Sequence, residues 1–361
     1  MRSIHTLKKY LTQACPSWSG HRLELLSQLV CALLRVRSVN LMKVAAAMAG
    51  PAQKMSRYRR LQRFFSAGLA PGVLTALIVK KVARAGKPLF LTLTLDRTHW
   101  KYGQTELNLL CLGLRYRGVS IPLEYLSLGK AGNSNTAERK YLFRRAWRYL
   151  KEYRCCLLAD REFIGIEWLA FLLRQSGLEF IIRIRCEGWL TFANGEKRYL
   201  SQLVRTLSKG QTRYYKNVLL YERNDRVRVH LVCHRSTKGE LVLLATNRPD
   251  LEQVLAEYKN RWSIETAFGF LKSRGFELEE THVTHPQRIQ LLLGVLSLTL
   301  LWALLVGLET AQRTPITLKK HGRKAISLVR LGLDHLQEIL TNFEDQWRVF
   351  RYYCRLLLSC T

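Results

Sequence analysis

The chain has 361 residues, which allow a sizeable buried core and predict two or three domains. Its 58 Lys and Arg against 27 Asp and Glu give a formal net charge of +31, which points first to a nucleic-acid partner and second to an anionic membrane surface. The nine cysteines include no C-x-x-C pair, which excludes a disulfide framework and a cysteine-based zinc site and is typical of a reducing cytoplasm.

Residues 1–86 form a basic segment with helical patterns, in which Glu24 is the only acid. A short apolar helix, "VNLMKVAAAMAG", is predicted to end at Gly50, and "PAQ" makes a turn before the arginine-rich helix "KMSRYRRLQRFF". This order is typical of a helix-turn-helix unit, although an amphipathic helix with solvated arginines has the same pattern. We therefore predict a DNA-binding domain whose contacts come from four arginines, Arg57, Arg59, Arg60 and Arg63.

Residues 87–275 alternate between strand and helix patterns. Three strands, "PLFLTLTLDRTHW", "ELNLLCLGLRYRG" and "VSIPLEYLSLG", come first, and the turn at Gly118 makes the last two antiparallel. A helix, the strand in "RCCLLADREF", a second helix and the strand "LEFIIRIR" follow. A polar, strand-rich insertion at about 186–240 separates them from the strand "ELVLLATN" and another helix. This order predicts an α/β fold with a ribonuclease H-like core and a β-rich insertion.

Residues 276–361 are predicted to be a helical C-terminal region. One run, Ile289–Leu308, is apolar over the length of a bilayer span. A fully buried helix in a large core has the same composition. The chain has a single run of this kind, so we expect a buried helix and no membrane partner.

Two aspartates, Asp96 and Asp160, each follow a strongly apolar strand. In α/β sheets functional groups gather at the carboxyl ends of strands. An aspartate at a strand end is also a common turn residue. Either aspartate alone is therefore weak evidence for a site.

The stretch "YKNRWSIETAFGFLK" supplies a third carboxylate. At about 100° per residue, Tyr258, Arg261, Glu265 and Lys272 fall within an arc of about 60° on a helix. The apolar face beside this stripe consists of Ile264, Ala267, Phe268 and Leu271. A solvated edge with an ion pair between residues four apart would also explain the stripe.

Three converging carboxylates predict a metal site. Their mutual repulsion raises their pKa values unless cations offset it. Two divalent cations about 3.5–4 Å apart would do so, and oxygen ligands favour Mg²⁺ or Mn²⁺. Such a pair activates water or a 3′-hydroxyl for attack on a phosphodiester. Glu265 would then hold metal, while Arg261, Lys272 and Tyr258 would hold phosphates beside it.

The spacing Tyr258-x2-Arg261-x3-Glu265-x6-Lys272 resembles the Tyr-Arg-Glu-Lys signature of DDE transposases of the insertion-sequence-four family, which are cut-and-paste enzymes. "LDRT" around Asp96 resembles the first-aspartate motif of that family, and "ADREF" around Asp160 resembles the second. "YRRLQRFF" and "VRLGLDHL" are also similar, so the resemblance covers most of the chain.

The resemblance implies a catalytic and metal-binding triad of Asp96, Asp160 and Glu265, with two Mg²⁺ ions per site and Mn²⁺ as a substitute. The enzyme would nick transposon ends, form and open a hairpin, and transfer the 3′ ends into target DNA. Its partners would be double-stranded DNA, as terminal inverted repeats and target, and a second copy in a homodimer that bridges two ends. It would work in the cytoplasm at the bacterial nucleoid.

One departure concerns the tryptophan that relatives carry at the start of the last strand and use to stabilise a flipped base. Here that region reads Gly239, Glu240, Leu241 and Val242. Trp262, beside the signature, or Trp189, in the insertion, could act instead, and we favour Trp262. A DDE nuclease without strand transfer and an inactive DNA-binding relic or repressor remain alternatives. The presence of all three carboxylates argues against the relic.

Overall fold

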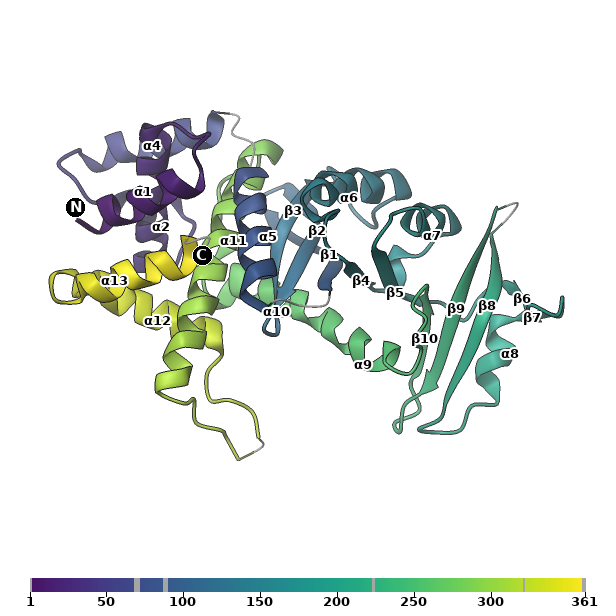
Figure 1. Ribbon diagram of the computed structural model, residues 1–361. Helices are drawn as coiled ribbons and strands as arrows, with labels where there is room; N and C mark the ends of the chain where they lie inside the picture. Colours follow the sequence, from purple (N-terminus) through teal and green to yellow (C-terminus); the bar gives the residue numbers. More distant parts are fainter. Residues whose placement is uncertain (1, 68–71, 87–89, 223–224, 321, 359–361) are drawn as a thin grey trace.

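The computed structural model describes every residue except 1, 68–71, 87–89, 223–224, 321 and 359–361. The N-terminal and C-terminal helices lie together at one end of the molecule (Figure 1). The core strands and their helices occupy the centre, and the strands of the insertion extend to the other end. The catalytic candidates lie in the central part, between these two flanks.

The N-terminal helices pack on one another and on the C-terminal helices. Asn40 caps the third of them, because its side chain accepts hydrogen bonds from the backbone N–H groups of Met42 and Lys43. That helix ends at Ala47, before the predicted end at Gly50, because Met48 adopts an extended conformation. The five helices are α1 (Arg2–Ala14), α2 (Gly20–Val36), α3 (Leu41–Ala47), α4 (Lys54–Ser66) and α5 (Gly72–Gly86).

The core of the sheet has the strand order β3-β2-β1-β4-β5. The first three strands pair antiparallel, while β4 runs parallel to both β1 and β5. Parallel neighbours need crossovers, which α6 (Thr136–Leu150) and α7 (Ile166–Leu173) supply. The strands are β1 (Leu91–Tyr102), β2 (Thr105–Tyr116), β3 (Val119–Ser127), β4 (Cys155–Ala159) and β5 (Leu178–Ile184). This is a ribonuclease H-like core, and the predicted fold class is confirmed.

The insertion continues the same sheet instead of forming a separate one. Strand β10 pairs antiparallel with β5 on one side and with β9 on the other, which gives ten strands in all among the described residues. Helix α8 was not predicted; its buried Leu200, Leu203 and Val204 have helical spacing, but six residues are too few to reveal it. The elements are β6 (Trp189–Thr191), β7 (Lys197–Tyr199), α8 (Leu200–Arg205), β8 (Thr212–Glu222), β9 (Asp225–Arg235) and β10 (Leu241–Thr246).

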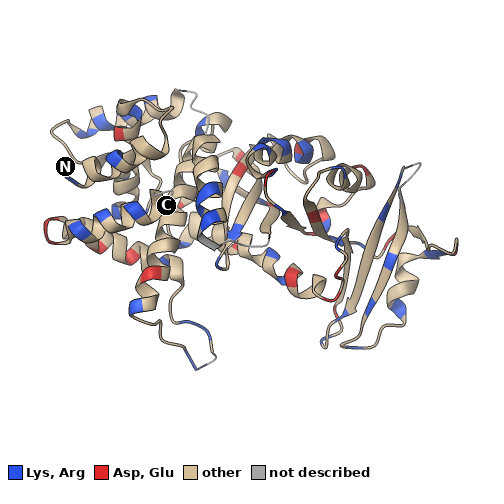
Figure 2. Ribbon diagram, viewed as in Figure 1, with Lys and Arg blue, Asp and Glu red and all other residues tan. Residues whose placement is uncertain are grey.

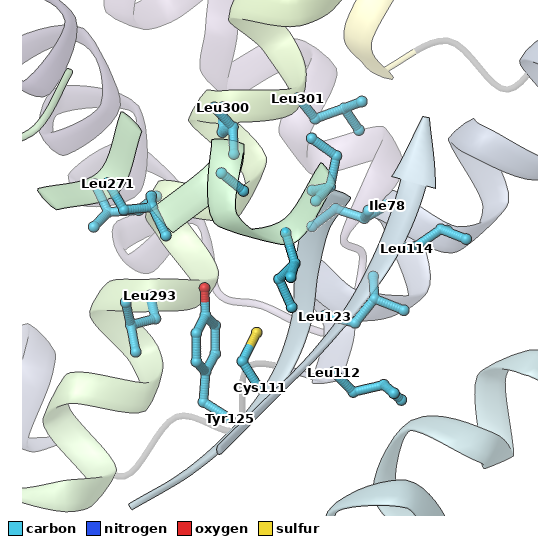
Figure 3. Packing of buried hydrophobic residues seen from close by; sticks show 14 of the residues in the cluster. Ile78, Cys111, Leu112, Leu114, Leu123, Tyr125, Leu271, Leu293, Leu300 and Leu301 are labelled. Carbon is cyan, nitrogen blue, oxygen red and sulfur yellow. The ribbon is translucent and has the colours of Figure 1, made fainter. Parts of the chain in front are cut away.

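The long apolar helix is α11 (Pro286–Arg313), and it lies inside the protein. Of the described helices it alone is long and apolar enough to cross a membrane, yet 94% of its most apolar window is buried. Leu293, Leu300 and Leu301 of this helix pack among Tyr125 and other side chains of the core (Figure 3). The apolar run is therefore a core helix, as expected.

Helices α12 (Leu328–Thr341) and α13 (Phe343–Leu358) complete the helical end. Gly307 of α11 faces Gly332 of α12, and a Cβ atom at either position would collide with the backbone of the other helix. The two helices thus approach as closely as glycine permits. This contact joins α11, which packs against β3, to the C-terminal helices.

Candidate active site

Strand register places the two aspartates side by side. The parallel pairing of β1 with β4 ends at Leu95 opposite Ala159, and the next residues are Asp96 and Asp160. Neighbouring strands lie about 4.8 Å apart, so the two carboxylates lie side by side where β4 ends. The register between β1 and β4 therefore places the two aspartates next to each other. The prediction that Asp96 ends its strand is wrong, because pairing with β2 extends β1 past Asp96 to Tyr102.

Glu265 reaches this edge from α10 (Ser263–Gly269). The helix packs against β1, β2 and β3 through its buried face, which includes Ile264 and Ala267. Arg261 lies one turn earlier and is 6% exposed. Its Nη2 donates to Glu265 Oε1 at 2.9 Å, and its Nη1 donates to Asp96 Oδ2 at 3.3 Å. One guanidinium therefore links the first and third carboxylates.

Tyr258 connects the same helical stretch to the second aspartate. It is the last residue of α9 (Val254–Tyr258) and is buried. Its Oη donates to Asp160 Oδ1 at a long distance of 3.5 Å. Burial and the nearby negative charge of Asp160 raise the pKa of Tyr258, so its phenol keeps the proton that it donates. The helical stretch thus contacts all three carboxylates, with Arg261 bonded to Asp96 and Glu265 and Tyr258 bonded to Asp160.

The stretch from Tyr258 to Lys272 is helical but not uniformly α-helical. Residues Lys259–Trp262 form a 3-10 turn, and Phe270–Arg274 form a π turn. A 3-10 turn has about 3.0 residues and a π turn closes from i to i+5, so a constant 100° per residue was the wrong geometry for this stretch. The apolar face survives, because Ile264, Ala267, Phe268 and Leu271 are all buried.

Lys272 lies in the π turn and points to other partners than the carboxylates. Its Nζ donates to the carbonyl oxygen of His99 at 2.7 Å and pairs with Glu279 at 3.1 Å. The same Nζ lies 5.6 Å from the ring centre of Trp100. In this conformation Lys272 fastens the helix to β1, and its predicted phosphate contact remains a prediction.

Electrostatics at the cluster follow from burial and crowding. Burial raises the pKa of Asp96 to about 6, and repulsion from Glu265 and Asp160 adds to the rise. The backbone N–H of Arg97 and the guanidinium of Arg261 oppose it. Burial lowers the pKa of Arg261, but the surrounding Tyr258, Asp96 and Asp160 raise it above its usual value overall. Arg261 is therefore a permanent cation in the cluster.

A second ion pair supports the aspartates, and sequence reasoning missed it. Arg97 Nε donates to Glu162 Oε1 at 2.8 Å, and its Nη2 donates to Oε2 at 3.1 Å. Arg97 also donates to Asn108 and Asn133, and both members of the pair are about 18% exposed. Arg97 follows Asp96, and Glu162 lies two residues after Asp160. The charged residues inside "LDRT" and "ADREF" were the available signal.

The donor set suits a hard cation. All three candidate ligands are carboxylates, which Mg²⁺ and Mn²⁺ prefer. Within the described residues, no three His, Cys, Asp or Glu side chains are grouped closely enough to hold one metal ion. Arg261 supplies the positive charge between Asp96 and Glu265 in this structure. Burial, with a smaller addition from the repulsion of Glu265 and Asp160, raises the pKa of Asp96, which fits a site that gains from further positive charge.

Both candidate tryptophans are on the surface. Trp262 is 60% exposed, and the guanidinium carbon of Arg261 lies 4.8 Å from its ring centre. Trp189 is 56% exposed and packs edge-to-face on Tyr199 with ring centres 5.4 Å apart. Neither indole is a core residue. Trp262 belongs to the stretch that carries Glu265, whereas Trp189 lies in the insertion.

The four arginines of α4 divide into two kinds. Arg57 bonds the carbonyl oxygens of Met48 and Gly50 and so closes the turn between α3 and α4. Arg60 is half-buried and lies close enough to Glu24 to lower the pKa of that carboxyl, together with the stronger effect of Lys8. Arg59 and Arg63 are exposed, one helical turn apart. The latter pair has the placement that a DNA contact needs.

Comparison with known proteins adds a family. Residues 127–302 match the family described as "Transposase DDE domain", and this segment is slightly less than half of the chain. It contains Asp160 and Glu265, and it begins after Asp96. This segment is therefore similar to the DDE domain of transposases.

No curated protein matches the chain. Among solved structures, the cryo-EM structure of the piggyBac transposase synaptic complex with hairpin DNA is similar, with a TM-score of 0.47 and 12% sequence identity. The similarity covers 98% of this chain and 80% of that chain.

Proposed function

We propose that the protein is a cut-and-paste DNA transposase of the insertion-sequence-four type. It would bind transposon ends, nick them, pass through a hairpin and transfer the 3′ ends into target DNA. The observation that carries the proposal is that Asp96 and Asp160 lie on neighbouring strands of a ribonuclease H-like sheet, while Arg261 bonds both Asp96 and Glu265. The match to the transposase DDE domain supports it.

In this proposal Asp96, Asp160 and Glu265 hold two Mg²⁺ ions, for which Mn²⁺ substitutes. Such ions, when bound, activate water or a 3′-hydroxyl and stabilise the leaving oxygen. Arg261 keeps Asp96 and Glu265 in place, and the protonated Tyr258 orients Asp160.

DNA contacts beside the carboxylates come from the remaining residues of the signature stretch. The exposed indole of Trp262 has an open face for a base of the hairpin. Tyr258, Arg261 and Lys272 reach phosphates only if they exchange the partners that they have here. Their bonds to the protein make orientation of the site the first role that we assign to Tyr258 and Arg261.

End recognition would use the N-terminal domain, with Arg59 and Arg63 as phosphate contacts of α4. The working unit would be a homodimer that bridges two terminal inverted repeats, and the protein would act on DNA in the cytoplasm at the nucleoid. This assignment rests on the exposure of the two arginines and on the resemblance of "YRRLQRFF" to the family.

The test uses purified protein, Mg²⁺ and a donor DNA that carries the element with its own flanking ends, beside the variant Asp160→Ala. Native and denaturing gels separate released element, hairpin-ended fragments and joined product. We expect the wild type to make all three and the variant to make none. Cutting by Asp160→Ala at the wild-type rate would refute the triad.

Two further outcomes separate the alternatives. Linear cuts without joined product, also with Mn²⁺ and supercoiled donor, would indicate a DDE nuclease. A clear gel shift of the ends without cleavage by either protein would indicate a DNA-binding relic.

A further inference from the structure

The outward side of α13 is built from arginine and aromatic side chains. At about 100° per residue, Trp347, Arg348, Arg351, Tyr352 and Arg355 fall within an arc of about 140°. All five are exposed, with Trp347 at 41% and Tyr352 at 42%. The opposite side of the helix is buried. Basic residues recur along this helix at the free end of the helical body (Figure 2).

Each aromatic ring on this side has guanidinium groups over it. The Cζ atoms of Arg348 and Arg351 lie 5.8 and 6.0 Å from the ring centre of Trp347. The Cζ atom of Arg313, from the end of α11, lies 5.9 Å from the ring centre of Tyr352. Cation–π contacts at exposed sites are weak, about 0.5–1 kcal/mol, but they hold the guanidinium groups in a preferred position. Less side-chain freedom is then lost when a ligand binds.

The negative charge near this side comes from Glu309, which is bonded to both Arg313 and Tyr352, and from Glu344 and Asp345 in the first turn of α13. After Asp345 the sequence contains no acidic residue. Glu309 is paired with Arg313 at 3.0 Å, and Glu344 is paired with Arg2 at 2.9 Å. Among the described residues, the ion pairs of these carboxylates are with Arg2 and Arg313, and none is with Arg348 or Arg351. Both guanidinium groups are therefore available to an external anion.

We propose that this surface, defined as Arg313, Trp347, Arg348, Arg351 and Tyr352 and called the α13 surface, binds the backbone of duplex DNA. It would be a DNA contact separate from α4 and from the carboxylate cluster. Arginine pairs with phosphate oxygens, and the exposed rings pack against the sugars beside them.

Charge decides between DNA and a second copy of the chain. The whole chain has a net charge of +31, so two α13 surfaces facing one another would repel. The phosphate backbone of DNA is complementary to the same surface. The choice of DNA as the partner rests on the proposed function, which already requires the protein to hold DNA.

The experiment measures binding of the full-length protein to a fluorescent duplex of arbitrary sequence, by anisotropy over a range of salt concentrations and without divalent metal. Each phosphate contact contributes about 0.9 to the slope of log K against log salt. We expect Arg348→Ala/Arg351→Ala to lower this slope by about 1.8 and to weaken binding about tenfold at moderate salt. Arg348→Lys/Arg351→Lys should restore the slope, because lysine keeps the charge.

The matched control is Arg144→Ala/Arg148→Ala on α6. These arginines are also exposed, lie within one helical turn of each other and also lie over aromatic rings, at 5.2 Å from Phe171 and 4.8 Å from Tyr149. An equal loss in this control would show a general effect of net charge and would overturn the proposal. An unchanged salt slope in the α13 variant would also overturn it.

Sedimentation of the same proteins without DNA tests the alternative that the α13 surface binds a second copy of the chain. If Arg348→Ala/Arg351→Ala changes the oligomeric state and leaves DNA binding intact, the α13 surface joins two copies and the proposal is wrong. Because binding is measured without cleavage, a protein that fails the excision test can still pass or fail this one. Thermal unfolding should be unchanged in the variant, since both side chains are exposed.

Discussion

Both the carboxylate cluster and helix α4 contain arginines, but the arginine of the cluster is buried whereas two arginines of α4 are exposed. Arg261 is 6% exposed and is bonded to two carboxylates, whereas Arg59 and Arg63 are exposed on the surface of α4. Removing one member of a buried ion pair leaves the other charge buried without compensation, which is costly. An exposed arginine contributes little to folding. The same residue type therefore bridges carboxylates in one region and lies exposed to solvent in the other.

The largest effect on activity is expected from Glu265→Gln, which keeps the shape of the side chain and removes its charge. DNA binding should persist, because α4 is untouched, while cleavage should fall by about a thousandfold or more. A cleavage assay and a gel shift on the same protein measure both. Near-normal cutting by the variant would contradict the role of Glu265.

Arg261→Ala tests the buried side of the comparison directly. It leaves Asp96 and Glu265 without their shared cation, and we expect the free energy of unfolding to fall by about 3 kcal/mol and cleavage to fall with it. Urea unfolding measures the first quantity. Arg59→Ala/Arg63→Ala is the control and should unfold like the wild type. Equal stability of all three proteins would show that Arg261 is not a structural cation.

The sequence predicted the parts of this arrangement that depend on one strand or helix at a time. Apolar alternation located β1 and a short apolar run located β4, and their parallel register, which ends at Leu95 opposite Ala159, brings Asp96 and Asp160 together. The pair of Arg97 with Glu162 was not predicted, since it depends on how β1 and the 3-10 turn after β4 lie relative to each other.

The assumption of uniform α-helical geometry also limited what could be predicted from the sequence. A single angle per residue placed Lys272 in line with Glu265, but the 3-10 and π turns change that angle on both sides of α10. The pattern of charges likewise did not distinguish Arg57, which closes a turn, from Arg59, which is exposed. Exposure depends on which helices pack together, and that information lies outside the segment.

The pH dependence of stability is the next test of the buried cluster. Asp96 has a pKa of about 6 in the folded protein against 3.8 as a free group, so the folded state holds a proton that the unfolded state releases between these values. The free energy of unfolding of the metal-free protein should therefore decrease as pH rises from about 4 to about 6. Asp96→Asn removes this loss.

Asp96→Asn should raise the free energy of unfolding by on the order of 2 kcal/mol at pH 7.5. The gain should be close to zero at pH 3.5, where the protonated Asp96 side chain of the folded protein is as neutral as asparagine. Urea unfolding in the presence of a chelator at the two pH values measures the difference. Equal effects of the substitution at both pH values would exclude Asp96 as the titrating group.

For the exposed arginines of α4 we predict an effect on DNA affinity without an effect on stability. Arg59→Ala/Arg63→Ala should lower the salt slope for binding transposon-end DNA by about 1.8, with an unchanged melting temperature. Arg57→Ala is the contrasting variant, because it removes the bonds to the carbonyls of Met48 and Gly50 and should lower the melting temperature. If Arg57→Ala alone weakened DNA binding without loss of stability, the division of α4 into two kinds of arginine would be wrong.

Lys272 is intermediate between the buried and the exposed cations, and its substitution should have the smallest effect. Its side chain is 21% exposed and is bonded to His99 and Glu279, so it belongs with the structural cations, yet it is close enough to solvent to meet a phosphate. If the role of Lys272 is to make its bonds to His99 and Glu279, Lys272→Ala should lower the free energy of unfolding by about 1 kcal/mol. Lys259→Ala, an exposed lysine of the same stretch, is the control. Unchanged stability together with weaker end binding would move Lys272 to the phosphate-binding group, and the signature would then combine an orienting arginine with a DNA-contacting lysine.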